Sequence, residues 1–250
     1  MESRVLPAVG LALLLAACNG YPTAPTPLAT SSGAAPAATP EATPTPTPPP
    51  APPPAPTARY RVTFEATWSP TTHPQDPPPS PHFSGLIGGT HNDQVTFWRE
   101  GAIATDGIKR MSELGSKTPL DEEVRAAIAA GNAQNLLSGG NIERAPGSAA
   151  ALEFEITTAF PLVTLVSMIA PSPDWFVGVS RLSLLENGQW IDERVIQLDP
   201  WDAGTDGGVT FTSPDLPLTP RLPIARITGF PFLAAGQVPP LGTFRFVRIG

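Results

Sequence analysis

Residues 60–68 read YRVTFEATW, and this stretch decides the fold class. Apolar side chains occupy every second position from Tyr60 to Trp68, with arginine, threonine and glutamate side chains between them. A period of two is typical of a β-strand that buries one face and exposes the other to water. The stretch therefore predicts the first strand of a β-rich domain.

Other segments repeat or vary this pattern along the chain. Residues 152–156 alternate in the same way, and residues 243–249 are rich in aromatic and branched side chains. Residues 162–170 are almost continuously apolar, which is expected of a strand covered on both faces. Shorter strands are predicted, between clusters of Gly, Pro and Asp, at residues 94–98, 175–179, 190–198 and 208–212. Short strands separated by such turns predict a β-sandwich.

Two short helices are predicted among the strands. Thr118 offers a capping hydroxyl before Pro119, an acid follows at Asp121, and Gly131 closes the segment. A second, shorter helix is predicted within residues 106–115, where three apolar residues lie at helical spacing. Neither helix carries recognisable chemistry, so we expect both to pack on the core.

The amino-terminal residues predict a targeting signal rather than a part of the folded domain. A short apolar run at residues 5–17 follows Arg4 and is too brief to span a bilayer, which is typical of a secretion signal. Residues 15–18 read LAAC and resemble the lipobox of bacterial lipoproteins, in which the cysteine is lipidated. We therefore expect a signal peptide at residues 1–17 and a membrane anchor on Cys18, with a plain signal peptide as the alternative. The expected location is the bacterial cell envelope, and Asn19 is compatible with the outer membrane.

Proline is unevenly distributed. The chain of 250 residues contains 34 prolines, and fourteen of them lie between Asn19 and Ala58. That stretch has almost no large apolar side chain, so it cannot bury enough surface to offset the entropy of ordering it. We expect residues 18–58 to form a semi-rigid tether, with a docking site for proline-binding modules as the alternative. Residues 59–250 then form one globular domain.

The charge distribution narrows the classes of partner. The formal net charge is −7, and the fifteen Lys and Arg residues are scattered without a basic patch. This argues against nucleic acid and against electrostatic docking to anionic lipid. A cation is the charged partner that the composition favours.

Three aspartates fall in loops at predicted strand ends. Asp174 follows the apolar strand at residues 162–170, whereas Asp202 and Asp206 stand four residues apart in a glycine-containing loop. Carboxylates brought together raise one another's pKa unless a cation lies between them. Hard oxygen ligands of this kind suit calcium, although the spacing differs from that of an EF-hand. The pattern alone leaves two readings open, a calcium site or aspartates that serve turns and strand ends.

Two long motifs resemble the spondin domain, which lies at the amino-terminal side of F-spondin and in mindin. Residues 171–179 read PSPDWFVGV and residues 201–208 read WDAGTDGG, with Trp190 between them. Shorter matches precede them in the family's order, at residues 60–68, 82–88, 98–101 and 107–115.

The resemblance implies an all-β fold, an eight-stranded antiparallel sandwich of the jelly-roll kind, similar to calcium-dependent lipid-binding domains. It implies one bound Ca²⁺ with Asp174, Asp202 and Asp206 as ligands, completed by a backbone carbonyl near residues 168–170. The resemblance thus favours a calcium site over aspartates that serve turns, and it implies a structural ion that holds two loops together. It also places Glu155 where some members carry an acidic recognition residue, although alternation alone puts Glu155 on the solvent face.

An enzyme is the main rival class of function. The chain contains no Gly-x-Ser-x-Gly, His-Glu-x-x-His or phosphate-binding glycine motif. His73, His82 and His91 come nine residues apart and could bind zinc, but backbone hydrogen bonds are the better interpretation.

We therefore expect a membrane-anchored lipoprotein whose monomeric, calcium-binding domain serves adhesion or binding without catalysis. The ligand would be an extracellular protein or glycan. The first alternative is a calcium-assisted carbohydrate- or matrix-binding module, with Trp175, Trp190 and Trp201 as sugar-stacking or core residues. The others are an envelope protein without a separate ligand and a hydrolase that uses the aspartate cluster.

Overall fold

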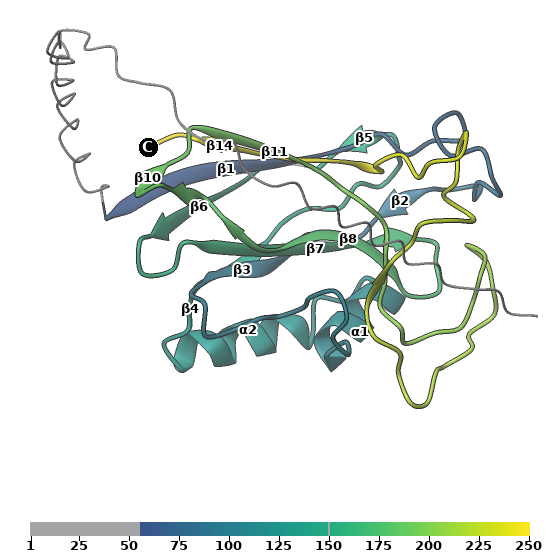
Figure 1. Ribbon diagram of the computed structural model, residues 1–250, viewed down its shortest axis with the longest axis horizontal. Helices are drawn as coiled ribbons and strands as arrows, with labels where there is room; N and C mark the ends of the chain where they lie inside the picture. The colour runs from purple at the N-terminus through teal and green to yellow at the C-terminus, as the bar shows by residue number, and fades with distance from the viewer. Residues whose placement is uncertain (1–55, 150) are drawn as a thin grey trace, which may run out of the picture. The chain divides into compact units, whose positions relative to one another are not determined.

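Eight strands of five or more residues build the domain in residues 56–149 and 151–250, the part of the chain that the computed structural model describes (Figure 1). They are β1 (Thr57–Ala66), β3 (Ile87–His91), β4 (Ala133–Ser138), β6 (Leu152–Thr157), β7 (Leu162–Ala170), β8 (Trp175–Ser183), β11 (Glu193–Gln197) and β14 (Gly242–Arg248). Six two-residue strands accompany them: β2 (His82–Phe83), β5 (Gly147–Ser148), β9 (Leu185–Glu186), β10 (Gln189–Trp190), β12 (Trp201–Asp202) and β13 (Ala225–Arg226).

The eight longer strands divide evenly between two sheets. One sheet has the order β11-β14-β1, with β6 also paired to β1, and the other contains β8-β7-β3-β4. Every strand pairing in the described residues is antiparallel. The ribbon shows the two sheets stacked, with the helices beneath the second sheet (Figure 1). The predicted all-β antiparallel sandwich is confirmed.

Strand β1 supplies the centre of the core between the sheets. Its inward residues are 5% exposed or less, and Trp68, just beyond the strand, is 1% exposed. The ring of Phe64 packs edge-on against Phe83 from β2 and Phe244 from β14, with ring centroids 4.9 and 5.1 Å apart. The period-two pattern of residues 60–68 thus predicted which face of the strand is buried.

Two helices cover the outer face of the second sheet. Ile108 and Met111 of α1 (Asp106–Leu114) pack with Val166 and Phe176 of the sheet. Val124 of α2 (Leu120–Ala129) packs in a further apolar cluster. Because helices lie on one face and the other sheet on the opposite face, β7 is buried on both sides, as its continuous apolar run predicted.

The amino-terminal cap of α2 differs from the prediction. Helix α2 begins at Leu120 with no side-chain cap, because the Thr118 hydroxyl donates to the Asp121 carboxylate instead of accepting from the backbone. The capped helix is α1, where the Thr105 hydroxyl accepts from the Ile108 amide at 3.1 Å. At its other end α1 stops at Gly115, with φ of 65°.

Two predicted strands are absent from the described structure. Residues 94–98 form no strand, because the Arg181 side chain takes the carbonyls of Asp93 and Val95. Residues 208–212 also form no strand. The Gly208 amide donates to the Asp206 carboxylate, and the amides of Val209 and Thr210 donate to the Ser213 hydroxyl. Side chains there satisfy backbone groups that a strand neighbour would otherwise pair.

A third predicted strand, at residues 190–198, is divided into β10 and β11. The Ile191 amide still donates within the preceding hairpin, to the Leu184 carbonyl, whereas the Asp192 carbonyl accepts from the amide of Arg248, the last residue of β14. The chain therefore changes partner between Ile191 and Asp192, which interrupts the strand.

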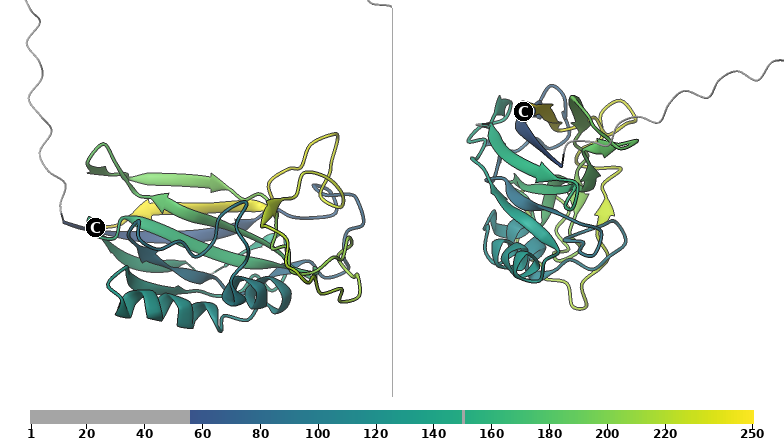
Figure 2. Two further views of the ribbon diagram at one scale, coloured as in Figure 1. Left: turned by 60° about the horizontal axis from the view of Figure 1, so that its bottom comes forward. Right: turned by 90° about the vertical axis from the view of Figure 1, so that its left-hand side faces the viewer.

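The loops that follow β12 gather at one end of the sandwich, and the carboxyl terminus lies at the other (Figure 2). Neither described helix has the length and apolar character needed to cross a bilayer. The predicted signal peptide, Cys18 and residues 18–55 of the predicted tether lie outside the described residues. Strand β1 begins at Thr57.

Candidate functional site

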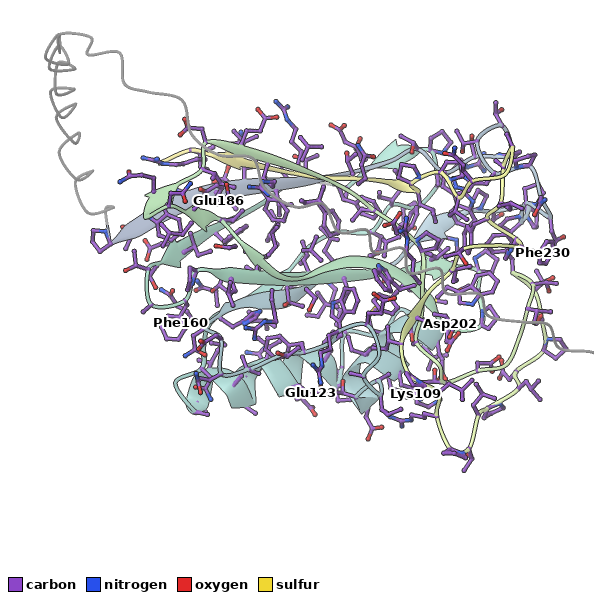
Figure 3. The ribbon with its side chains drawn as sticks, viewed as in Figure 1. Lys109, Glu123, Phe160, Glu186, Asp202 and Phe230 are labelled. Atoms are coloured by element: carbon purple, nitrogen blue, oxygen red, sulfur yellow. The ribbon has the colours of Figure 1, made fainter. Side chains whose placement is uncertain are left out.

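Sheet pairing brings the three predicted aspartates to one end of the sandwich. Asp174 immediately precedes β8, and Asp202 pairs across the ladder with Trp175, the first residue of β8. The Ala203 amide donates to the Asp174 carbonyl at 3.2 Å, which joins the two segments directly. Figure 3 labels Asp202 at the end where the long loops gather.

Asp174 is fully buried, and its two carboxylate oxygens differ. Oδ2 accepts three hydrogen bonds, from the Thr205 amide at 2.7 Å, the Thr205 hydroxyl at 3.2 Å and the Asp206 amide at 3.1 Å. Oδ1 has no hydrogen-bond partner in the described part of the chain. The sequence did not single out Thr205, although its place between Asp202 and Asp206 was the available signal. A buried carboxylate oxygen without a partner is costly unless a proton or a cation occupies it.

The raised pKa values of Asp174 and Asp202 reflect the cost of burying their charges. Burial, followed by the nearby Asp202 charge, raises the pKa of Asp174 from an ordinary 3.8 to about 7, against the hydrogen bonds from Thr205 and Asp206. Burial also raises the pKa of Asp202, opposed chiefly by a hydrogen bond from the Gly204 amide, while the Asp206 charge raises it further. Each carboxylate therefore acts on the next, and the three form one electrostatic unit.

Asp206 is turned toward its own loop. Its Oδ1 accepts from the Gly208 amide at 2.8 Å and its Oδ2 from the Leu216 amide at 2.7 Å. In residues 56–149 and 151–250, no three His, Cys, Asp or Glu side chains are grouped so that they could hold a metal ion. The charges of the three aspartates nevertheless interact, because the Asp202 charge acts on Asp174 and the Asp206 charge acts on Asp202.

Glycine makes the close approach of these loops possible. Gly204 has a φ of 71°, and a Cβ there would lie 2.1 Å from the Leu222 carbonyl oxygen. The Leu222 amide in turn donates to the Gly204 carbonyl at 2.8 Å. Any side chain at this position would separate the two segments.

The tryptophans proposed for sugar stacking lie mostly in the core. Trp175 is 3% exposed and packs against Phe211 and Phe232, with ring centroids 5.3 Å away in both cases. Trp190 is 6% exposed, and Trp201 is half-buried beside Trp98. Trp175 therefore presents no open ring face to a ligand, which leaves Trp201 as the half-exposed member of the three.

Glu155 lies on the solvent face of β6, as alternation predicted, opposite Arg59 in the register with β1. Arg59 instead forms an ion pair with Glu153 at 2.8 Å, and Arg61 pairs with the same carboxylate at 2.6 Å. Glu155 therefore belongs to the sheet of β1, whereas Asp174 and Asp202 lie at the ends of β8 and β12 in the other sheet.

The three histidines occupy separate environments and bond mainly to backbone. His73 contacts the Pro239 carbonyl at 3.0 Å, and His82 contacts the Ser80 carbonyl at 2.8 Å. His91 contacts the Asn92 carbonyl at 2.7 Å and the Thr164 hydroxyl at 2.8 Å. The predicted backbone hydrogen bonds are thus present at all three histidines.

The accessibility of the aspartates bears on hydrolytic chemistry. Asp206 lines a cavity of about 110 Å³ together with Ser172 and Asp215. Asp174, whose pKa would suit a general acid, is fully enclosed and lines none of the described cavities. A catalytic carboxyl must come within hydrogen-bond reach of its substrate, so this geometry favours a structural role.

Comparison with known proteins agrees with the motifs. A family model described as Spondin_N matches residues 58–232. Spondin-2 of Rattus norvegicus is 33% identical over 181 residues, which cover 68% of this chain and 54% of that protein. Spondin-1 of Homo sapiens is 38% identical over 155 residues, which cover 59% of this chain and 19% of that protein. The chain therefore spans about half the length of Spondin-2 and about a fifth of Spondin-1.

Proposed function

The chain belongs to the Spondin_N family, and on that basis we propose that its domain is an extracellular, non-catalytic module for binding or adhesion. One calcium ion holds the loops at its acidic end. The observation that carries the calcium proposal is the buried Oδ1 atom of Asp174, which lacks a hydrogen-bond partner in the described residues and lies close to the Asp202 charge.

The residues at this end fit a hard cation. Asp174 offers its free oxygen, and Asp202 is a second acid held next to it by the ladder between β8 and β12. Asp206 already accepts two backbone hydrogen bonds, but each carboxylate oxygen carries a second lone pair and can accept again. Backbone carbonyls and water would complete the six to eight oxygens that calcium takes.

The ion's contribution here is charge neutralisation. Two carboxylates with raised pKa values become stable as anions when a divalent cation lies between them. Asp174 and Asp202 belong to different chain segments, so the ion fixes the turn before β8 against the loop after β12. Extracellular modules typically bind calcium at roughly 0.1 to 1 mM, a range that suits a structural ion.

Thermal unfolding tests the calcium proposal. We expect 2 mM calcium to raise the melting temperature of a chelator-treated sample, and Asp202→Ala to remove that rise. Asp215→Ala is the matched control, since it removes a neighbouring exposed acid and should leave the rise intact. A melting temperature that is the same in calcium and in chelator would overturn the proposal.

The amino-terminal sequence supports a lipid anchor for this module. Residues 15–18 carry the lipobox-like LAAC, and the proline-rich stretch after Cys18 provides a spacer between membrane and domain. We expect Cys18→Ala to move the protein from the membrane fraction to the soluble fraction of its host. Intact-mass analysis should find acyl groups on the wild-type chain alone, and an unmodified wild-type cysteine would refute the anchor.

A further inference from the structure

A cavity of about 250 Å³ lies beside the carboxyl end of α1, and Asp174 is not among the residues that line it. Three chain segments and β7 meet around it, and the residues that matter for its chemistry are His82, Leu114, Gly115, Asn141, Glu143 and Met168. Pockets for cofactors and drug-sized ligands typically measure about 300 to 1,000 Å³. The volume is therefore better matched to a single amino-acid side chain.

The acidic wall of the cavity is formed by Glu143 with Asn141. The Asn141 amide group donates to Glu143 Oε1 at 2.9 Å, which leaves the Asn141 carbonyl oxygen as an acceptor. Glu143 forms no ion pair with any residue of the described chain. One full negative charge and several free lone pairs therefore border the cavity.

His82 adds an acceptor on another side. Its Nδ1 lies 2.8 Å from the Ser80 carbonyl oxygen, and that contact requires a proton on Nδ1. In the neutral ring the remaining nitrogen, Nε2, then carries a lone pair.

Helix α1 points its negative end at the cavity. The helix ends at Leu114, followed by Gly115, and its last turn contains no basic residue to offset the carbonyl dipoles. Leu114 also lines a neighbouring cavity, whose lining includes the Lys109–Glu113 ion pair as well as Asp206 and Asp215. The nearby Lys117 side chain, whose Cε approaches Gly85, donates from its ammonium group to the Ser138 hydroxyl and the Gly139 carbonyl, both at 2.8 Å. Glu143 and the end of α1 therefore supply the negative charge that faces the cavity.

Apolar side chains complete the lining. Leu114 is 60% exposed, and the thioether of Met168 also lines the cavity. Long basic side chains bury an aliphatic stem on apolar surface while their charged head stays with polar groups. An acceptor-rich, negatively charged cavity with apolar walls matches that chemistry.

We propose that this cavity binds an arginine side chain presented by a protein partner. The guanidinium group supplies five donors in a planar fork, which suits the Glu143 carboxylate and the neighbouring Asn141 and His82 acceptors. The proposal goes beyond the calcium-held module, since none of these three acceptors is a proposed calcium ligand.

Nuclear magnetic resonance titration of the ¹⁵N-labelled full chain with N-acetyl-arginine amide tests the proposal. We expect saturable shifts at the amides of Gly85, Gly115 and Asn141. Glu143→Gln should weaken binding roughly tenfold or more, because it removes the charged acceptor. Glu122→Gln, an exposed acid on α2, is the matched control and should leave the affinity unchanged.

Two analogues of the arginine probe test whether charge and the planar guanidinium shape are both needed for binding. N-acetyl-citrulline amide has nearly the same shape without the charge and should bind at least tenfold more weakly; equal binding would overturn the proposal. N-acetyl-lysine amide should also bind more weakly, and tighter binding of this probe would refute the choice of arginine. Equal arginine affinity in calcium and in chelator is expected, so that failure of the calcium proposal and failure of this one are distinguishable.

Discussion

The Asp174 carboxylate accepts a hydrogen bond from the backbone amide of Thr205 at 2.7 Å, although 31 residues separate them in the chain. This contact ties the turn before β8 to the loop after β12. It involves only one of the two carboxylate oxygens, and the other is buried without a partner in the described structure. The same side chain thus joins two segments and carries an electrostatic cost that protonation or a cation can remove.

The first prediction concerns pH in calcium-free buffer. The folded-state pKa of Asp174, about 7, exceeds its ordinary value of 3.8, so the folded chain holds the proton more tightly than the unfolded chain. The stabilising contribution is complete below pH 3.8 and is lost as pH rises through 7. At about 1.4 kcal/mol per pKa unit, the loss is on the order of 4 kcal/mol.

Asp174→Asn measures this contribution, because the amide keeps the shape and cannot titrate. In chelator, urea unfolding should find the variant more stable than wild type at pH 8, with the difference shrinking toward pH 5. In calcium the order should reverse, since the variant has lost a ligand. A variant less stable than wild type at pH 8 in chelator would contradict the assigned pKa.

The second prediction concerns the contact between the helices. Glu123 of α2 accepts from the Gly107 amide and the Thr105 hydroxyl, both at 2.8 Å, and so caps the start of α1 from outside it. Figure 3 shows Glu123 in the helix layer. We expect Glu123→Ala to lower the free energy of unfolding by about 1 to 2 kcal/mol in urea titrations. Glu122→Ala, at an exposed neighbouring position, should change it by less than about 0.5 kcal/mol.

Sequence patterns predicted those elements whose burial is regular. Strand β1 alternates because one face meets the core, and β7 is continuously apolar because a sheet and the helices cover its two faces. The motifs around Asp174 and Asp202 correctly located two loops that the ladder between β8 and β12 brings together.

Sequence patterns failed where the pattern of side chains does not reflect the structure. All five residues of β3 are buried and two are glycines, so the strand has neither alternation nor a branched, apolar composition. Residues 94–98 alternate like a strand, yet the distant Arg181 donates to the carbonyls of Asp93, just before the segment, and of Val95 within it. The orientation of Asp206 depends on the Leu216 amide, ten residues away, and spacing alone could not reveal it. In each case a contact distant in sequence decided the local structure.

The third prediction follows from the close approach of β3 to β7. A Cβ at Gly88 would lie 2.0 Å from the Thr164 carbonyl oxygen, which belongs to the backbone and cannot rotate away. Gly88→Ala should therefore destabilise the domain by at least about 3 kcal/mol in urea or thermal unfolding. At Gly140 a Cβ would meet nothing within 4 Å, so Gly140→Ala is the matched control and should be nearly neutral. A Gly88→Ala domain of wild-type stability would show that β3 and β7 do not pair as described.

The fourth prediction concerns acid sensitivity at His91. Burial lowers the pKa of this imidazole below its ordinary 6.5, against the hydrogen bond to the Asn92 carbonyl, and the Arg181 charge lowers it further. The unfolded chain therefore binds the proton more tightly, and the stability contributed by the neutral ring is present above pH 6.5 and is lost as pH falls through the folded pKa. His91→Gln removes this titration, so the stability of wild type relative to the variant should decrease between pH 7.5 and pH 5. Since Asp174 is present in both proteins, its opposite pH dependence cancels from the comparison, and a constant difference between wild type and His91→Gln would exclude the buried neutral imidazole.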